Sequence, residues 1–489
     1  MKNVKSNTEN SKSNKLGMWA LAAIVVSSMI GGGIYSLPQN MAAGASAGAV
    51  LLAWIITGLG IYFIAKTFSI LSVAKPQLTT GIYSYSRAGF GSYIGFIIGW
   101  SYWLCQVCGN VGYAVITMDS LDYFFPGTFT GGNNLASIIG GSVIIWFFNC
   151  LVLRGIKQAS FINFIGTIIK IVPLILFIIV MMFVFNIDKF DFDFWGESAA
   201  SKLKLGSLST QVKSTMLVTL WAFIGIEGAV VMSTRAKSQN VIAPATILGF
   251  LGCLIIYILL SLLPFGYMNQ EELSQITNPS TAGILEHIIG KPGAWIMNIG
   301  LLISVLTSWL AWTLVTAQIP QAAAIDGTFP KVFAKENAHE VPSVSLIVTS
   351  CAMQLFLLLV YFSNNAWNTM LSITSVMVLP AYFTSCAYLW KICEDGEYPN
   401  GLIFKKSSAL ITAILGSIYA LWLIYAAGLQ YLLMAVIIIA LGIPVYITAK
   451  KQHNAKAKIF SKHEKYLVVM LLILSLFAIY AMVRGLIHI

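Results

Sequence analysis

Charged residues are scarce in this chain. Asp, Glu, Lys and Arg make up 10% of its 489 residues, whereas 58% of the residues are hydrophobic. Soluble globular domains carry about 25% charged residues. The mean hydropathy is correspondingly high, at +0.81. This composition excludes an ordinary soluble domain and predicts an integral protein of the lipid bilayer.

Histidine and cysteine offer little material for a metal or redox centre. The five histidines are scattered over loops and the C-terminal tail, without the spacing of metal ligands. The seven cysteines fall in or at the ends of apolar segments, so we expect no disulfide framework. Cys105 and Cys108 form a CxxC inside an apolar run, but no second Cys or His pair accompanies them, which favours helix packing. We therefore expect no metal and no cofactor.

Catalytic motifs are also missing, apart from one literal match. The chain contains no HExxH, P-loop or GxGxxG pattern. Residues 44–48 read GASAG and so match GxSxG, but a nucleophile elbow requires a strand-to-helix turn in an α/β sheet. Here the glycines form a small-residue turn between two apolar segments. We expect no enzymatic activity.

Apolar runs long enough to cross a bilayer recur along the whole chain. A hydrocarbon core of about 30 Å requires about 20 apolar residues in a helix. The last run, 466–485, follows a lysine-rich linker at 451–465, so it is either a thirteenth span or an appendage to a twelve-helix core. The predicted spans are 16–38, 47–70, 92–118, 136–153, 161–185, 214–233, 243–266, 293–318, 343–362, 369–391, 408–427, 430–449 and 466–485.

The net charge of +11 lies in alternate loops and not in one patch. Predicted inner loops hold bases such as Arg87, Arg154 and Lys331, whereas the outer loops hold few, with the exception of 186–213. This asymmetry indicates that the N-terminus is cytoplasmic. It also argues against a nucleic-acid partner. Residues 1–15 are polar and basic and predict a disordered cytoplasmic tail.

Two of the predicted spans contain residues that interrupt a helix at mid-membrane. The first holds Gly31–Gly33, and each glycine weakens a helix by about 1 kcal/mol relative to alanine. In the sixth, Gly225 and Gly228 bracket Glu227, an acid that costs roughly 2.5–3.5 kcal/mol at the bilayer centre on insertion scales. Glycine-broken segments at matching places in two halves are typical of transporters built from inverted repeats. The alternative is close packing of helices through small residues.

Polar and aromatic residues near these breaks indicate a site for a cation with a carboxylate. N–H groups freed by a break suit a carboxylate. Trp221 and Trp312 could stack on a guanidinium or ammonium group, a contact worth about 0.5–2 kcal/mol, and Gln106 and Asn110 could accept its hydrogen bonds. The alternative for a membrane tryptophan is an interfacial anchor. We expect that simpler role for Trp54, Trp195 and Trp295.

The motifs around the breaks resemble one transporter family. GGGIYSLP, SYWLCQVCGN, LWAFIGIEGAVV, STRAKS and WTLVTAQIPQAAAIDGTFPKVFAKEN are similar to segments of the basic amino acid/polyamine antiporters of the amino acid–polyamine–organocation superfamily, and most of all to arginine/ornithine antiporters. The resemblance covers about residues 16–450. It implies an all-α polytopic fold of 12–13 transmembrane helices with five-plus-five inverted repeats, in which helices 1 and 6 are discontinuous. Repeat one would occupy 16–185 and repeat two 214–391, followed by two helices at 408–449.

The resemblance also implies roles for individual residues. Met29, Gly32 and Gly33 would hold the carboxylate and α-amino group of the substrate. Gly32 stands where relatives often have serine, so one hydroxyl contact to the carboxylate is lost. The remaining substrate-binding residues implied are Cys105, Gln106 and Asn110 of the third span, Trp221 and Ile224 of the sixth, Trp312 of the eighth and Thr374 of the tenth.

Three further residues are implied in gating or proton coupling. Glu227 matches an acid linked to proton sensing or gating, and Tyr102 matches an aromatic residue of the outer gate. Lys170 lies nine residues into the fifth span, and several relatives have a lysine there, at the sodium position of sodium-coupled members. A lysine at that position could exchange a proton or replace a bound Na⁺ by its own charge. We expect Lys170 to make transport independent of Na⁺.

The function that follows is exchange of a cationic amino acid (arginine) for a related amine (ornithine) by alternating access in a bacterial inner membrane. Within the same class, the alternatives are proton-coupled uptake of cationic amino acids and exchange of arginine for agmatine or of lysine for cadaverine. A channel or an amino acid sensor is the alternative from another class, but no repeated pore-lining filter is present. The family resemblance leaves room for a homodimer.

Overall fold

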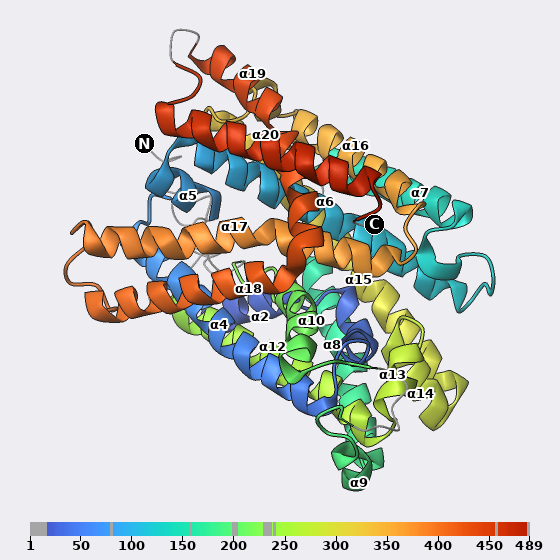
Figure 1. The fold of residues 1–489 in the computed structure, drawn as a ribbon. Coiled ribbons are helices and arrows are strands. Elements are labelled where there is room, and N and C mark those ends of the chain that lie inside the picture. The colour runs from blue at the N-terminus through green and yellow to red at the C-terminus, as the bar shows by residue number, and fades with distance from the viewer. Residues whose placement is uncertain are drawn as a thin grey trace, which may run out of the picture.

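In the computed structural model of the protein, the regular elements of the described part of the chain are all helices. That part comprises residues 17–78, 82–155, 159–197, 204–227, 237, 241–454 and 458–486. The predicted tail, 1–15, and the last six residues of the predicted sixth span, 228–233, lie outside it. Figure 1 shows the helices packed side by side in one bundle.

The first half of the chain, up to the second predicted break, contributes α-helices of very unequal length. They are α2 (Met18–Met29), the 3₁₀ helix η1 (Gly32–Ser36), α3 (Leu37–Ala42), α4 (Ala47–Ala74), α5 (Ile82–Phe90), α6 (Ser92–Asp122), η2 (Thr130–Gly132), α7 (Leu135–Leu153), α8 (Ala159–Val184), α9 (Ile187–Asp191) and α10 (Leu208–Ala222).

The second half adds the longest helices. They are α12 (Ile242–Leu262), η5 (Leu263–Gly266), α13 (Gln270–Gln275), α14 (Ser280–Ile289), α15 (Lys291–Ile325), η6 (Lys331–Ala334), α16 (Ser343–Val360), α17 (Ala366–Glu394), α18 (Lys406–Ala440), α19 (Ile443–His453) and α20 (Lys462–Val483).

The helices confirm an all-α polytopic membrane protein. Among the described residues, eight helices are long and apolar enough to cross a membrane, and α2 with η1 and α3 adds a ninth as one bent span. This is fewer than the predicted 12–13, partly because the single stretch Lys406–His453 covers two predicted spans, 408–427 and 430–449. The helix there continues through Gly428, whose φ of 79° marks a kink. In addition, α6 is 31 residues long but contains many polar residues, and α10 ends after 15.

Two helices occupy the centre of the bundle. α17 packs against α18, α6, α10 and α5, and α15 packs against α6, α8, α14 and α16. In Figure 1, α17 and α18 run side by side across the bundle. The short elements α9, α13 and α14 gather at its lower right end, and α5 lies with the α17–α18 turn at the opposite, left end. On the predicted topology these are the outer and inner ends, respectively. Helix α5 was not predicted from the sequence, because it lies between two predicted spans.

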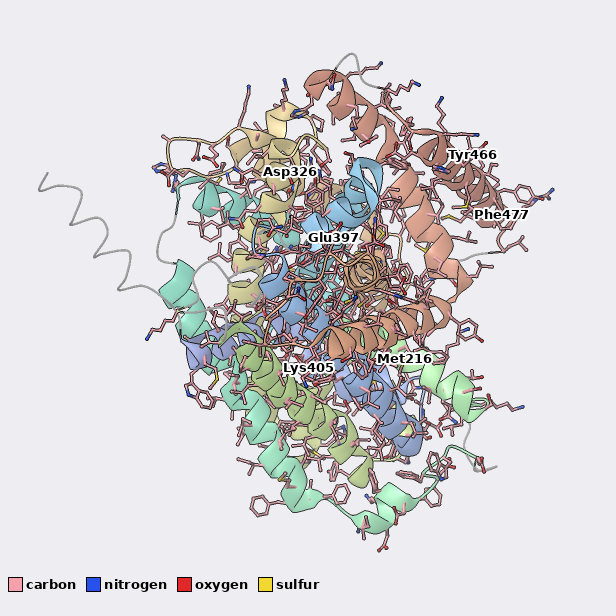
Figure 2. The ribbon with its side chains drawn as sticks, turned by 90° about the vertical axis from the view of Figure 1, so that its left-hand side faces the viewer. Met216, Asp326, Glu397, Lys405, Tyr466 and Phe477 are labelled. Atoms are coloured by element: carbon pink, nitrogen blue, oxygen red, sulfur yellow. The ribbon has the colours of Figure 1, made fainter. Side chains whose placement is uncertain are left out.

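The C-terminal region differs from the prediction in its linker. Helix α19 continues to His453 and α20 already begins at Lys462, so the two ends of the predicted linker 451–465 are helical. The side chains of Ser461 and Glu464 each accept a hydrogen bond from the other's backbone N–H, a capping box that starts α20. This helix packs along α18, and its residues Tyr466 and Phe477 point away from the bundle in Figure 2.

One of the three predicted interfacial tryptophans is a core residue instead. Trp54 has no exposed surface and packs against Phe223 and Tyr257, with ring centroids 6.2 and 6.0 Å away. Trp54 lies in α4, which is apolar along most of its length. The sequence therefore does not indicate which face of this helix packs against other helices. Trp195 and Trp295 are 44% and 52% exposed, as interfacial anchors would be.

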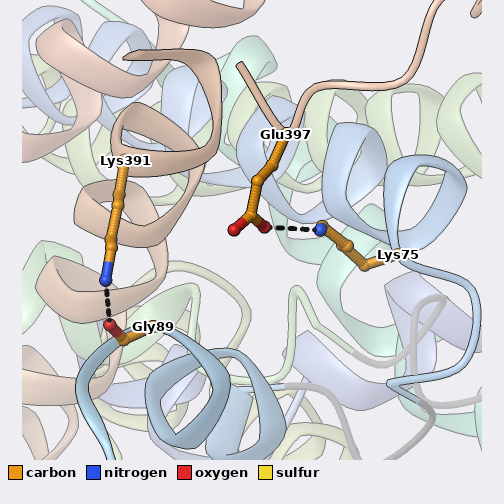
Figure 3. A network of polar contacts seen from close by, with 4 residues as sticks. All are labelled: Lys75, Gly89, Lys391 and Glu397. Atoms are coloured by element: carbon orange, nitrogen blue, oxygen red, sulfur yellow. Dashed lines mark hydrogen bonds and ion pairs between the residues drawn. The ribbon is translucent and has the colours of Figure 1, made fainter. Parts of the chain in front are cut away.

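Polar contacts fasten the inner end of the bundle. Lys75 at the end of α4 donates to the Glu397 carboxylate at 3.0 Å, and Lys391 of α17 donates to the Gly89 carbonyl at 2.8 Å (Figure 3). Arg87 of α5 pairs with Asp326 at the end of α15, also at 3.0 Å. Asp326 and Glu397 both lie on the face that Figure 2 turns toward the viewer. These contacts join α4, α5, α15 and α17 at this end of the bundle.

Candidate functional site

The first predicted break is present at the predicted glycines. Helix α2 ends at Met29, Gly31 is extended with φ −106° and ψ −162°, and η1 begins at Gly32. The two halves of the span are bent by 57°. Three consecutive residues without a Cβ lower the cost of leaving the helix, which is why the break falls here.

The second predicted break is also present. Helix α10 ends at Ala222, five residues before Glu227, and the chain turns through Gly225 with a φ of 105°. Residues other than glycine rarely adopt that backbone conformation. The remainder of this predicted span, from Gly228, lies outside the described residues.

The two breaks touch each other directly. The Ser28 hydroxyl lies 2.8 Å from the carbonyl oxygens of both Val25 and Gly225, to either of which it can donate. A Cβ on Gly225 would lie 2.7 Å from the Ser28 carbonyl oxygen. Gly225 is therefore required both by its φ and by the close approach of the other broken segment.

A small cavity of about 30 Å³ lies beside this contact. The cavity is lined by Ser28, Met29, Gly31, Gln106, Gly109, Asn110, Tyr113, Trp221, Ile224, Trp312 and Thr374. The structure thus gathers most of the substrate-binding residues predicted from the sequence, and from five different elements.

The polar atoms of the lining include several without a partner. Asn110 uses its amide N–H₂ to donate to the Gln106 carbonyl at 2.7 Å and to Thr316 at 3.1 Å, which leaves its Oδ1 as an acceptor. That oxygen, Gln106 Nε2 and Thr374 Oγ1 are buried and have no hydrogen-bond partner among the described residues. Buried polar atoms nearly always have partners, so a ligand is expected to supply them.

Charge is absent from the described lining. Its side chains are apolar, aromatic, hydroxyl or amide groups. A cation held here would be bound by aromatic faces and neutral acceptors and not by a carboxylate. Such a site can accept ligands that differ in net charge.

Trp221, which lines the cavity, is backed by a second tryptophan. Trp221 of α10 packs edge-on against Trp367 of α17, with ring centroids 5.4 Å apart and planes at 82°. Gly33 lies beneath this pair, and a Cβ on it would come within 2.1 Å of the Trp221 ring and 2.5 Å of the Trp367 ring. The second tryptophan was not predicted.

Three of the predicted binding residues do not line the cavity. Gly33 supports the tryptophan pair, and Cys105 is fully buried beside the cavity wall. Gly32 faces α15, where a Cβ would come within 2.1 Å of Val305. In this backbone arrangement a serine at position 32 would not fit unless Val305 moved, so packing accounts for the glycine.

Glu227 is held by three donors and does not line the cavity. Its carboxylate accepts hydrogen bonds from Tyr102 at 2.5 Å, Tyr382 at 3.2 Å and the Gly225 N–H at 3.2 Å. The side chain is 3% exposed. These contacts tie the second break to α6 and α17, which fits a gating group better than a ligand contact.

The position of Tyr102 departs from the expectation of an outer gate. It precedes the cavity-lining residues of α6 and therefore lies nearer to α5 than they do. On the predicted topology this is the inner side of the cavity. The hydroxyl donates there to Glu227, which also accepts a hydrogen bond from Tyr382.

Lys170 supports the first break. Its Nζ donates to the Ser27 carbonyl at 2.7 Å, and its own carbonyl accepts a hydrogen bond from Tyr35 of η1 at 3.0 Å. The side chain is 1% exposed. No carboxylate lies within ion-pair distance of Lys170 in the described part of the chain, so Glu227 is not its partner there.

The site residues that were not predicted differ in whether the sequence carries a signal for them. Gln106, Asn110 and Tyr113 stand at positions i, i+4 and i+7 of one helix, so helical spacing alone could have added Tyr113 to the site. Ser28 and Gly31 belong to the predicted break itself. Trp367 and Tyr382, in contrast, carry no local signal, because only the packing of α17 brings them to the site.

Comparison with known proteins agrees with this geometry. The chain is 61% identical over 476 residues to the arginine/agmatine antiporter of Chlamydia abortus, covering 97% of this chain and 98% of that protein. It is 60% identical over 481 residues to the arginine/agmatine antiporter of Chlamydia pneumoniae, covering 98% and 99%. The corresponding antiporter of Chlamydia trachomatis serovar D is 55% identical over 480 residues, covering 98% and 99%.

The family assignment follows from a second comparison. The sequence pattern described as "Amino acid permease" matches residues 16–443, nearly the whole helical bundle. Together with the named relatives, this confirms the resemblance to basic amino acid antiporters and a transporter in place of an enzyme. The chain belongs to the amino acid permease family of the amino acid–polyamine–organocation superfamily.

Proposed function

We propose that this cationic amino acid antiporter exchanges arginine for agmatine by alternating access. The observation that carries the proposal is the uncharged cavity between the two interrupted helices, with tryptophans and unpaired polar atoms in its wall. The relatives named above, at 55–61% identity over nearly the full chain, are arginine/agmatine antiporters. Met29, Gln106, Asn110, Trp221, Ile224, Trp312 and Thr374 are the proposed contacts.

The chemistry of the two ligands suits such a cavity. Arginine carries one net positive charge and agmatine two, because agmatine lacks the carboxylate. A carboxylate in the wall would favour the more highly charged ligand. The faces of Trp221 and Trp312 and the Asn110 oxygen can instead receive the guanidinium group that both ligands share.

Ornithine, the exchange partner expected from the sequence motifs, remains a prediction to be tested beside agmatine. Proteoliposomes preloaded with labelled arginine would be diluted into agmatine, ornithine, lysine, cadaverine or putrescine. We expect the fastest efflux with agmatine, and we expect it to respond to membrane potential because unequal charges are exchanged. Fast, potential-insensitive efflux with ornithine and none with agmatine would contradict the proposal.

The same vesicles test the alternative of proton-coupled uptake. An antiporter requires substrate on both sides, so empty vesicles should not accumulate arginine under an imposed pH gradient. Accumulation in empty vesicles would identify a symporter. Arginine binding without any flux would instead point to a sensor.

We also propose that transport is independent of Na⁺ because Lys170 occupies the place of a bound cation. Its Nζ already donates to the carbonyl of Ser27 at the end of α2, where the break frees carbonyl groups. Arginine exchange should therefore be unchanged when choline replaces Na⁺. A strict requirement for Na⁺ would exclude this role.

The remaining features of the proposal concern the cell. The chain is a multi-pass membrane protein, and we place it in the bacterial inner membrane with a cytoplasmic N-terminus, as its loop charges predict. Protease protection of an N-terminal tag in spheroplasts tests this orientation. A homodimer stays a prediction, which cross-linking in native membranes can test.

A further inference from the structure

Tyr113 is the cavity-lining residue that neither the motifs nor the proposed cation contacts explain. It projects from α6 into the cavity, and its hydroxyl oxygen lies 2.8 Å from where a Cβ on Gly31 would be. The phenol therefore ends directly against the interrupted segment. Tyr113 is partly buried, and its hydroxyl makes no hydrogen bond to another residue that the structure describes.

The cavity has two chemically distinct ends. At one end, Gln106, Asn110 and Thr374 supply unpaired amide and hydroxyl atoms. At the other end, the backbone around Ser28 and Gly31 meets the tip of Tyr113. Along α6, Tyr113 lies three residues beyond Asn110, a rise of about 4.5 Å.

A ligand with a guanidinium group and a carboxylate would span these ends. The guanidinium carries only donors, so it belongs with the Asn110 oxygen. Its α-carbon end then lies against Tyr113 and the interrupted segment. A tyrosine hydroxyl can donate to a carboxylate there without adding charge to the cavity.

We propose that the Tyr113 hydroxyl donates a hydrogen bond to the carboxylate of the amino acid substrate and thereby sets the preference between an amino acid and its decarboxylated amine. This inference rests on the proposed exchange of arginine for agmatine. Tyr113 is a specificity-determining residue in this account, because agmatine presents no carboxylate to it. A bond to an ionised group is among the stronger hydrogen bonds in proteins.

The test is equilibrium binding to the purified full-length protein in detergent, with Tyr113→Phe beside wild type. The three probes are arginine, argininamide, which replaces the carboxylate by an amide, and agmatine, which lacks it. Loss of one hydrogen bond to a charged group should weaken arginine binding about tenfold. Agmatine should change by less than about twofold. Argininamide keeps an amide oxygen that accepts a weaker, uncharged hydrogen bond, so its loss should lie between those of agmatine and arginine. A matched control is Tyr446→Phe, which removes a buried hydroxyl that has no partner among the described residues, on α19 and outside the cavity.

Each outcome of the binding experiment either supports or contradicts the proposed role of the Tyr113 hydroxyl. An arginine-selective loss in Tyr113→Phe, with Tyr446→Phe unchanged, supports the role. Equal losses for all three probes would reveal a structural role, and unchanged arginine binding would exclude the hydrogen bond, so either result overturns the proposal. Should Tyr113→Phe fail to fold, Tyr113→Met removes the same hydroxyl with a flexible apolar side chain and is judged by the same criteria.

The proposed function and the proposed role of Tyr113 are tested by separate measurements. Binding of the three probes is measured without transport, so absence of arginine–agmatine exchange by the wild type would reject the function and leave the binding result intact. Ornithine and putrescine provide a second pair that differs by a carboxylate. If the hydroxyl recognises the carboxylate, Tyr113→Phe should weaken ornithine binding and spare putrescine.

Discussion

At Glu227 a single carboxylate holds three parts of the molecule together. Tyr102 reaches it from α6, Tyr382 from α17 and the Gly225 N–H from the second break. The cavity lies beside this cluster and does not include the acid. Movement of the second break during transport would have to change these three hydrogen bonds, and protonation of the acid would weaken them.

Replacing Glu227 by glutamine should separate gating from binding. Arginine affinity should stay within about twofold, because the cavity lining is unaltered. Exchange should slow and lose most of its dependence on pH, because charge-assisted hydrogen bonds are about twice as strong as neutral ones. Binding is measured by calorimetry and exchange in proteoliposomes over a series of pH values. Tyr382→Phe, which removes one donor to Glu227, should slow exchange less than Glu227→Gln does. Loss of arginine binding in Glu227→Gln would instead show that the carboxylate takes part in binding the substrate.

The site also shows which single residues a sequence can disclose. Gly31–Gly33 and Glu227 are conspicuous because glycine runs and acids are costly inside an apolar span. Trp367 and Tyr382 are ordinary members of a chain with 13 tryptophans and 20 tyrosines. Their importance arises only when α17 packs against α10 and α6. Trp54 was misplaced for the same reason, since its burial depends on neighbouring helices.

At the scale of elements, the close contact between the two interrupted segments restricts which residue can occupy position 225. Gly225→Ala should destabilise the protein, because its φ of 105° is strained for alanine and the new Cβ would approach the Ser28 carbonyl oxygen to 2.7 Å. Strain of this kind costs on the order of 1–3 kcal/mol. A lower melting temperature of the purified protein and loss of exchange are the expected results.

Gly252→Ala provides the matched comparison. Gly252 lies within α12, and a Cβ there would meet no atom within 4 Å. Alanine favours a helix over glycine by roughly 1 kcal/mol, so this variant should melt at the same or a higher temperature. Equal melting temperatures for the two variants would show that the close approach at Gly225 does not limit stability.

The inner end allows a prediction about pH. The hydrogen bond from Lys75 holds the pKa of the exposed Glu397 carboxyl below its ordinary value. A lowered folded-state pKa means that the pair stabilises the fold above the ordinary pKa and that this contribution is lost as pH falls through the folded value. Glu397→Gln should therefore lower the melting temperature slightly at neutral pH and not at all in strong acid.

Because the pair is exposed, the effect should be small and reduced by salt. The double variant Lys75→Met/Glu397→Gln should melt like Glu397→Gln at neutral pH, since either change breaks the pair. A stability difference that persists unchanged into strong acid would mean that Glu397 acts through packing. These contacts were beyond sequence analysis, because α5 and the α17–α18 turn that bring them together are defined by tertiary packing.

At the scale of the whole molecule, the question is whether the transporter core requires the C-terminal helix α20. The permease pattern ends at residue 443, before α20 begins at Lys462. The curated relatives nevertheless match over 97–98% of the chain, so they share this helix. The sequence predicts a segment set apart from the core. It could not show that Phe460, just before α20, packs against Tyr93 and Tyr446 with ring centroids 5.3 and 5.6 Å away.

Two truncations should therefore behave differently. Ending the chain after Ser461 removes α20, whose apolar window is only 17% buried, and should leave arginine exchange intact with a modestly lower melting temperature. Ending it after Asn454 also removes Phe460 and exposes Tyr93 and Tyr446, rings that the full chain buries completely. Aromatic pairs contribute about 0.5–1.5 kcal/mol each beyond their buried area, so this second variant should be the less stable of the two.

Exchange and melting temperature are compared for both variants in the same detergent and lipid. Loss of exchange in the longer variant would show that α20 is part of the working core, whereas equal stability would show that Phe460 does not anchor the segment.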